Sequence, residues 1–328
     1  MNRPGSRHAA ALVLAVGVTC ALHIGKLPVA IPVLRDAMGV TLVQAGFLLS
    51  LVQMAGMLLG VFVGLAADRL GPRRVMLAGL CLLALGSGWG AASTGVQGLL
   101  ASRTLEGLGF LLAVLPAPGL LRRQVQDPRL LSRALGWWGA YMPLGTALAL
   151  LLGAPLMQVV GWRAVWLLLG GASLVAALVL FAAIGRDDAM PAPAPAWQRL
   201  HRTLSARDPW LVAVAFLLYS GQWLAVIGFL PTIVGQAGYP GAVVGLLSAV
   251  AALVNMVGNV GAGRWLAGGV RPGWVLAVAY LTMGLAAVVA FGAQGHPVLQ
   301  YAAVLVFSAV GGLIPGTLFV LAVRLAPG

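Results

Sequence analysis

The sequence predicts an all-α, polytopic membrane helical bundle, because it is strongly apolar and its apolar residues form long runs. Hydrophobic residues make up 61% of the 328 positions, charged residues only 8%, and the mean hydropathy is +0.99. A water-soluble fold of this composition would expose large apolar patches. Backbone polar groups in lipid must be paired within the segment, so the spans are expected to be helices.

Apolar runs of about 20 residues, long enough to cross about 30 Å of hydrocarbon, recur along the whole chain. We place ten spans, at 10–31, 42–66, 75–93, 97–118, 134–157, 163–184, 209–231, 241–266, 274–292 and 298–321. The first run is too long for a cleaved signal peptide, and it carries Pro28 and Pro32 where a cleavage site needs small residues.

The positive charges predict the orientation of these spans. With a cytoplasmic N-terminus, the inner segments carry sixteen of the 20 Lys and Arg residues: Arg3, Arg7, Arg69, Arg73, Arg74, Arg122, Arg123, Arg129, Arg133, Arg186, Arg199, Arg202, Arg207, Arg264, Arg271 and Arg324. The outer loops carry only Arg35 and Arg163. This asymmetry predicts a multi-pass protein of an inner (plasma) membrane with both termini cytoplasmic. The net charge of +13 then reflects topology, and we expect no nucleic-acid partner.

The longest polar interval, 185–208, predicts the domain organisation. Alternating Pro and Ala at 191–196 favour an extended connector. We therefore expect an N-terminal six-helix bundle at 1–184, a cytoplasmic linker at 185–208 and an incomplete four-helix bundle at 209–328.

The stretch 64–74, GLAADRLGPRR, concentrates charge between the second and third spans. A tight turn at its second glycine and a proline next to it would start the third helix. Its aspartate suits that helix's N-terminus, and its arginines can meet carbonyls at the end of the second span. The stretch is either a topological anchor or a conformational switch, and the candidate switch residues are Gly64, Asp68, Arg69, Gly71, Arg73 and Arg74.

This stretch resembles the signature loop of the major facilitator superfamily (MFS), G-x-L-a-D-r-x-G-r-r, with Pro72 as a departure. The segment 103–109, RTLEGLG, resembles the family's fourth-helix pattern, and 161–166, GWRAVW, is similar to its turn between spans 5 and 6. The resemblance implies an MFS fold and secondary transport by alternating access, with 64–74 as a latch. The family's antiporter pattern is poorly kept around Pro143, which weakens a drug/proton antiporter reading.

Family members have twelve spans, whereas this sequence carries ten and ends shortly after Arg324. We expect a truncated form of a twelve-span protein in preference to a ten-span variant. A truncated, non-transporting membrane protein is therefore one alternative function.

Three ionisable residues within the spans, Lys26, Arg103 and Glu106, need a partner or a purpose in lipid. Helix rise places them at similar depths, and His23 shares a helix face with Lys26. One more cation than acid would attract an anionic solute, and Glu106 or His23 could carry a coupling proton. The alternatives are a structural Arg103–Glu106 ion pair, a Lys26 that snorkels to the outer surface, and a His23 that only packs.

Polar residues of span 7, Tyr219, Ser220, Gln222 and Trp223, could orient a ligand from the second half, or could simply hydrogen-bond between helices. Glycines 56, 60 and 64 form a small-residue ridge that predicts close helix packing, and we assign Asn255 and Asn259 to helix packing as well.

The sequence has no Walker loop, HExxH, CxxC or GxSxG motif. We therefore expect no enzyme, catalytic residue, cofactor or metal, and we expect Cys20 and Cys81 to be packed thiols. The predicted function is secondary transport of a small anionic solute, with or without a coupled proton. The alternative within transport is proton-coupled export of a hydrophobic drug.

Overall fold

The computed structural model describes residues 5–185, 195–236 and 238–324, and every regular element in these ranges is a helix. The all-α prediction is therefore confirmed. The helices are α1 (Gly5–Met38), α2 (Leu42–Leu70), α3 (Pro72–Ala92), α4 (Val96–Val114), α5 (Ala117–Gln124), α6 (Pro128–Trp138), α7 (Tyr141–Ala183), α8 (Ala196–Ser205), α9 (Arg207–Gln236), α10 (Gly241–Leu253), α11 (Asn255–Ala267), α12 (Pro272–Gly292), α13 (Pro297–Gly311) and α14 (Leu313–Arg324).

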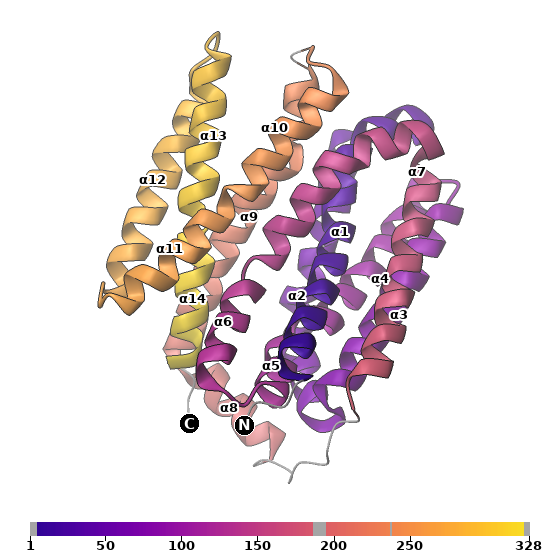
Figure 1. The fold of residues 1–328 in the computed structure, drawn as a ribbon. Helices are drawn as coiled ribbons and strands as arrows, with labels where there is room; N and C mark the ends of the chain where they lie inside the picture. The colour runs from indigo at the N-terminus through magenta and orange to yellow at the C-terminus, as the bar shows by residue number, and fades with distance from the viewer. Residues whose placement is uncertain (1–4, 186–194, 237, 325–328) are drawn as a thin grey trace. The chain divides into compact units, whose positions relative to one another are not determined.

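By length and composition, eight helical stretches in the described ranges can cross a membrane, and nine if the bent helix α2 is one span. Helix α2 bends by 40° between Gly56 and Leu58. The 43 residues of α7 consist of two arms that meet at Gly161, where φ is 80° and ψ is 158°. Figure 1 shows α7 reversing its direction. These arms correspond to the predicted fifth and sixth spans, and the polytopic membrane fold is confirmed.

Two boundaries differ from the sequence prediction. The fifth span begins at Tyr141 and not at 134, because residues 128–138 form the separate helix α6. The Ala140 N–H bonds to the Trp137 carbonyl at 2.9 Å, a tighter turn that separates the two helices. In the predicted linker, residues 186–194 lie outside the described ranges, but 196–205 form α8. The extended connector expected at 191–196 falls mostly outside the described ranges and stays a prediction, and the part of the interval that directly precedes α9 is helical.

The described chain forms two compact units. The first comprises Met1–Met190 and Leu230–Leu246, and the second comprises Pro191–Phe229 and Leu247–Gly328. In the first unit α1 packs along α7, and α3 packs against both α4 and α7. In the second unit α12 packs against α13, and α11 against α14. The domain boundaries at 184 and 209 remain a prediction.

The core of the first unit buries Cys20 completely, as expected for a packed thiol. Cys81 is exposed, so the same prediction was wrong for this residue. It lies on α3 in an exposed row with Leu85 and Trp89, spaced four residues apart. Residues spaced in this way share one helix face, which here points away from the core.

Glycines bring α4 close to its neighbours. A Cβ on Gly107 would lie 2.8 Å from the Cα of Val52 on α2, and one on Gly109 would lie 2.6 Å from the backbone N of Leu83 on α3. The fourth-helix glycines therefore permit close packing on two sides. The ridge expected on α2 is different, because a Cβ on Gly60 or Gly64 would meet no atom within 4 Å. The prediction of close packing at this ridge was wrong for these two glycines.

Candidate functional site: a buried charge cluster in the first unit

The structure brings together the four ionisable residues that we predicted to lie within membrane spans of the N-terminal half. His23 and Lys26 lie on α1, and Arg103 and Glu106 lie on α4. Each of these side chains is at most 1% exposed. They form one buried cluster, which we call the charge cluster.

The Glu106 carboxylate lies between the two cations of the charge cluster. Its Oε1 is 2.5 Å from Nζ of Lys26, and its Oε2 is 2.5 Å from Nη1 of Arg103. His23 Nδ1 lies 3.4 Å from both Glu106 Oε1 and Lys26 Nζ. A buried carboxylate that binds two cations through separate oxygens is the central element of this network.

Neutral groups compensate for the second cation of the cluster. Arg103 donates to the carbonyl of His23 at 2.9 Å and to the carbonyl of Leu48 at 3.3 Å. Lys26 Nζ donates to Ser87 Oγ at 2.9 Å and lies 4.4 Å from the centroid of the Trp166 ring. Carbonyl dipoles and an aromatic face both attract a cation, which lowers the energetic cost of burying a net positive charge.

Two residues of this network were missed by the sequence analysis, Ser87 on α3 and Ser173 on α7, and a third, Trp166 on α7, was noted only as part of the 161–166 turn. Ser87 accepts from Lys26 and donates to the Trp166 carbonyl at 2.8 Å. Ser173 Oγ lies 2.8 Å from Nε2 of His23. Single serines and a tryptophan in apolar spans give no spacing signal, so only the packing of α3 and α7 against α1 and α4 identifies them.

Small residues on α3 make room for the cluster. A Cβ on Gly86 would lie 2.9 Å from the backbone N of Glu106, and one on Gly90 would lie 2.7 Å from Cδ1 of Trp166. The backbone of α3 therefore approaches both α4 and α7 at the level of the cluster.

The geometry decides between two of the earlier alternatives for the charged residues. The interpretation of Lys26 as a snorkelling side chain is wrong, because its ammonium group is buried against Glu106. Arg103 and Glu106 form the predicted i, i+3 ion pair, but within a larger network.

The predicted switch loop has one buried arginine. Gly71 joins α2 to α3 with φ of 91°, and Pro72 is the first residue of α3. Arg73 is 6% exposed; its Nη2 donates to the Phe181 carbonyl at 2.6 Å, and its guanidinium lies 4.9 Å from that residue's ring centroid. We expected a carbonyl at the end of the second span, whereas this carbonyl lies near the end of α7. Cations are favourable at such helix C-termini.

The other switch candidates lie at the surface or in α2. Three charged side chains of the loop are exposed: Asp68, Arg69 and Arg74. Gly64 is half-buried and lies within α2.

In the second unit the predicted ligand-orienting residues differ in their exposure. Tyr219 is 7% exposed, and its hydroxyl lies 3.2 Å from Nδ2 of Asn255, which also donates to the Ser308 carbonyl at 2.8 Å. The Gln222 side chain is exposed. Tyr219 and Asn255 thus form an interhelical hydrogen bond, the kind of contact given as the alternative, and a ligand-orienting role for Tyr219 and Gln222 stays a prediction.

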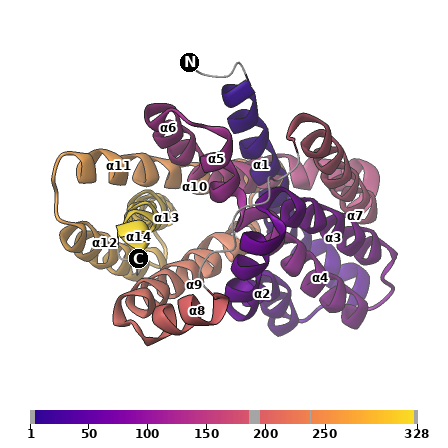
Figure 2. The ribbon, with the colours of Figure 1, turned by 90° about the horizontal axis from the view of Figure 1, so that it is seen from below.

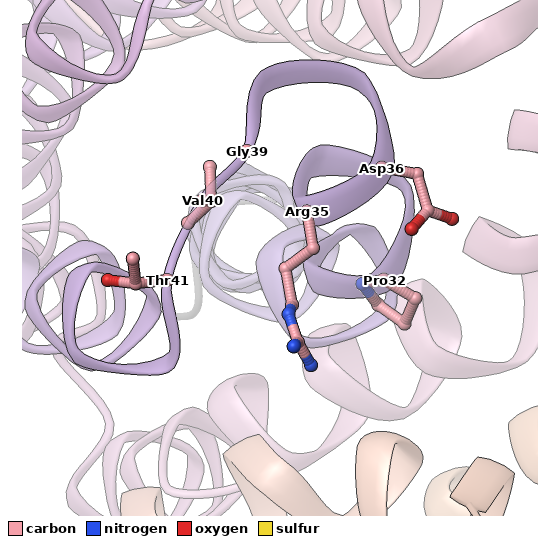
Figure 3. A pocket seen from close by; sticks show the side chains of 6 residues that line it. All are labelled: Pro32, Arg35, Asp36, Gly39, Val40 and Thr41. Carbon is pink, nitrogen blue, oxygen red and sulfur yellow. The ribbon is translucent and has the colours of Figure 1, made fainter.

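A surface pocket lies between the end of α1 and the start of α2, and Figure 3 shows the six residues that line it. They are Pro32, Arg35, Asp36, Gly39, Val40 and Thr41. Thr41 caps α2, since its hydroxyl accepts from the Gln44 N–H. None of the predicted site residues lines this pocket, and the charge cluster is a separate feature.

Comparison with known proteins gives related sequences and folds. A Methylenomycin A resistance protein from Bacillus subtilis (strain 168) is 33% identical over 142 residues, 42% of this chain and 29% of that protein. A Tetracenomycin C resistance and export protein from Streptomyces glaucescens is 35% identical over 123 residues, 37% of this chain and 23% of that protein. These matches span less than a third of either relative.

Two solved structures share the fold at low sequence identity. A bacterial homolog to the human lysosomal transporter Spinster, in an inward-facing and unoccupied conformation, has a TM-score of 0.73 and 13% identity over 100% of this chain and 77% of that one. A D-xylose–proton symporter has a TM-score of 0.70 and 14% identity over 97% of this chain and 85% of that one. The model of the Major Facilitator Superfamily matches residues 10–328. The chain therefore belongs to the Major Facilitator Superfamily, as the signature loop and the fourth-helix pattern predicted.

Proposed function

We propose that this protein is a secondary transporter, not an enzyme, and that it moves a small anionic solute together with a proton by alternating access. Membership of the Major Facilitator Superfamily supports transport as the activity. The observation that carries the proposed coupling is the position of Glu106, whose two oxygens bind Lys26 and Arg103 separately.

The charge balance of the cluster links a proton to an anion. While Glu106 is ionised, it screens two cations from each other in a region of low dielectric. A proton on Glu106 would remove that screening and leave Lys26 and Arg103 with no acid between them. An anionic solute could then replace the missing negative charge. In this structure the cluster is closed, because its four side chains are at most 1% exposed.

The charge balance of the cluster also favours proton-coupled anion binding over an anion site that is always open. The ammonium of Lys26 and the guanidinium of Arg103 already hold partners in this conformation. An anion that met an ionised Glu106 would be repelled by it and would find these donors occupied. Solute entry therefore depends on a change at Glu106, for which His23, 3.4 Å away, is the neighbouring proton carrier.

Proton-coupled export of a hydrophobic compound is the second candidate function. It is favoured by the two relatives named for resistance to, or export of, methylenomycin A and tetracenomycin C. In that case the charge cluster would bind only the proton, and the compound would bind elsewhere.

Purified protein in liposomes that contain a trapped pH-sensitive dye distinguishes these functions. We expect organic anions to drive proton movement, and Glu106→Gln and Lys26→Met to abolish it. Asp36→Asn, at an exposed acid outside the cluster, is the matched control and should leave proton movement unchanged. Proton movement driven by hydrophobic compounds alone would favour the exporter. Unchanged anion-driven proton movement in both cluster variants would refute the coupling role of the cluster.

We also propose that the protein lies in the inner membrane with cytoplasmic termini, that the bundles 1–184 and 209–328 rock about the linker 185–208, and that the 64–74 loop is the latch. Tyr219 and Gln222 would act from the second bundle.

The predicted orientation can be tested at Arg122 and Thr94, which are exposed and lie on opposite predicted sides of the membrane. Cysteines at these positions, in a background without Cys20 and Cys81, should react with a membrane-impermeant reagent in intact cells only at 94. Labelling at 122 would reverse the orientation.

A further inference from the structure

Helix α8 lies directly before a membrane-spanning helix. It ends at Ser205, and the apolar stretch of α9 that can span a membrane begins at Arg207. Only Ala206, with extended backbone angles of φ −84° and ψ 138°, separates the two helices. Figures 1 and 2 show α8 at the lower end of α9. Because one residue spans at most about 3.6 Å, the C-terminal end of α8 must lie at the level where α9 enters the membrane.

The apolar side chains of α8 share one helix face, and two of the three are exposed. Trp197 is 73% exposed and Leu204 is 45% exposed, with Leu200 between them partly buried. At 3.6 residues per turn, positions 197, 200 and 204 fall on one side of the helix. Trp210, at the start of α9, is also 54% exposed, and its Nε1 donates to the Leu204 carbonyl at 2.8 Å.

The remaining surface of α8 is polar and basic. Gln198, His201 and Arg202 are exposed, and the interval from 189 to 207 contains no acidic residue. A short amphipathic helix with tryptophan and leucine on one face and cations on the other is typical of segments that lie in the membrane interface. Tryptophans concentrate at this level because one end of the ring is apolar and the other can hydrogen-bond.

We propose that α8 is an interfacial anchor that binds an anionic lipid surface. Trp197 and Leu204 enter the boundary between headgroups and acyl chains, while Arg202 contacts lipid phosphates. Basic segments next to a spanning helix bind anionic lipids through their charge, and apolar burial adds to that binding. The hydrogen bond from Trp210 to Leu204 fixes the end of α8 to the start of α9, so the anchor is attached to the second unit. This inference does not depend on the transported solute.

The test uses the full chain in nanodiscs, with Cys20→Ala and Cys81→Ala as the background. An environment-sensitive fluorophore is attached to Leu204→Cys on the apolar face or, as the matched control, to Gln198→Cys on the polar side. The nanodiscs contain phosphatidylcholine alone or with phosphatidylglycerol. Nitroxide-labelled lipid and a water-soluble nickel chelate serve as competing quenchers.

With phosphatidylglycerol we expect the label at 204 to be quenched severalfold more by lipid nitroxide than by the nickel chelate, and the label at 198 to show the reverse. Adding Arg202→Gln or raising the salt concentration should reduce lipid quenching at 204, because screening weakens surface charge.

Two outcomes overturn the proposal. Equal access of the nickel chelate to both positions in both lipids would mean that α8 stays in water. A label at 204 that neither quencher reaches would mean that protein covers this face. An unchanged thermal unfolding midpoint of the labelled variants establishes that the fold is intact.

Discussion

The ammonium group of Lys26 lies over the ring of Trp166, 4.4 Å from its centroid. This contact joins α1 to the second arm of α7, and the same ammonium group lies 2.5 Å from the carboxylate of Glu106. Trp166 also packs edge-on against Trp162, with ring centroids 5.4 Å apart. The surplus positive charge of the cluster is therefore stabilised partly by an aromatic ring.

We expect Trp166→Leu to lower the free energy of unfolding, and part of the loss to require Lys26. A double-mutant cycle with Lys26→Met isolates that part, which should be about 0.5–2 kcal/mol for a desolvated cation–π contact. Thermal or denaturant unfolding of the four proteins in detergent measures it. Strict additivity of the two substitutions would show that the ring does not stabilise the ammonium group.

Removing the acid of the cluster should be more damaging than removing one cation. Glu106→Gln leaves Lys26 and Arg103 buried without a counter-charge, and we expect a loss of about 3–5 kcal/mol of unfolding free energy. Adding Lys26→Met should recover part of that loss, because one buried cation is then gone. The exposed acid Asp36 is the control, and Asp36→Asn should leave the unfolding midpoint unchanged. A Glu106→Gln protein as stable as the native protein would contradict the ion-pair network.

Two glycines on α3 provide a matched pair. A Cβ on Gly86 would lie 2.9 Å from both the backbone N and the Cγ of Glu106, whereas one on Gly88 would meet no atom within 4 Å. Gly86→Ala should therefore destabilise the protein by about 1–3 kcal/mol through overpacking. Gly88→Ala should be neutral or slightly stabilising, since alanine favours a helix. Equal unfolding midpoints for the two variants would mean that α3 and α4 do not approach as closely as described.

Arg73→Ala should destabilise the first unit, because it removes a hydrogen bond from a charged donor to the Phe181 carbonyl and a contact with the Phe181 ring. We expect a loss of about 1–3 kcal/mol. Arg74→Ala, at the next residue, is the comparison because its side chain is exposed, and its effect should be smaller. Unfolding in detergent measures both. A larger effect at Arg74 would mean that the exposed arginine, not the buried one, fixes the loop.

The sequence predicted the helical membrane fold, because apolar runs and the distribution of arginines depend on composition along the chain alone. It also predicted that Lys26, Arg103 and Glu106 lie at one depth, since helix rise converts residue number into height. Sequence spacing could not identify Ser87, Trp166 or Ser173. Their roles depend on how α3 and α7 are rotated about their own axes, and packing sets that rotation.

The same limit explains one contact that the sequence could not supply and one wrong prediction. The Arg73 side chain donates to a carbonyl near the end of α7, a helix end that is distant in sequence but close in space. The glycines of α2 have no close neighbour at 60 and 64, although their spacing is typical of helix contacts. A small-residue pattern indicates that close approach is permitted, and the tertiary structure decides whether it occurs.

The contacts of Lys26 have a mechanical consequence. Its ammonium group contacts side chains of α3, α4 and α7 at one level, so sliding α1 by one helical turn, about 5.4 Å, would break all of them at once. Helices α1, α3, α4 and α7 are consequently expected to move together as one rigid body. Flexing in the first unit would fall on α2, which is bent by 40° and has free space beside Gly60.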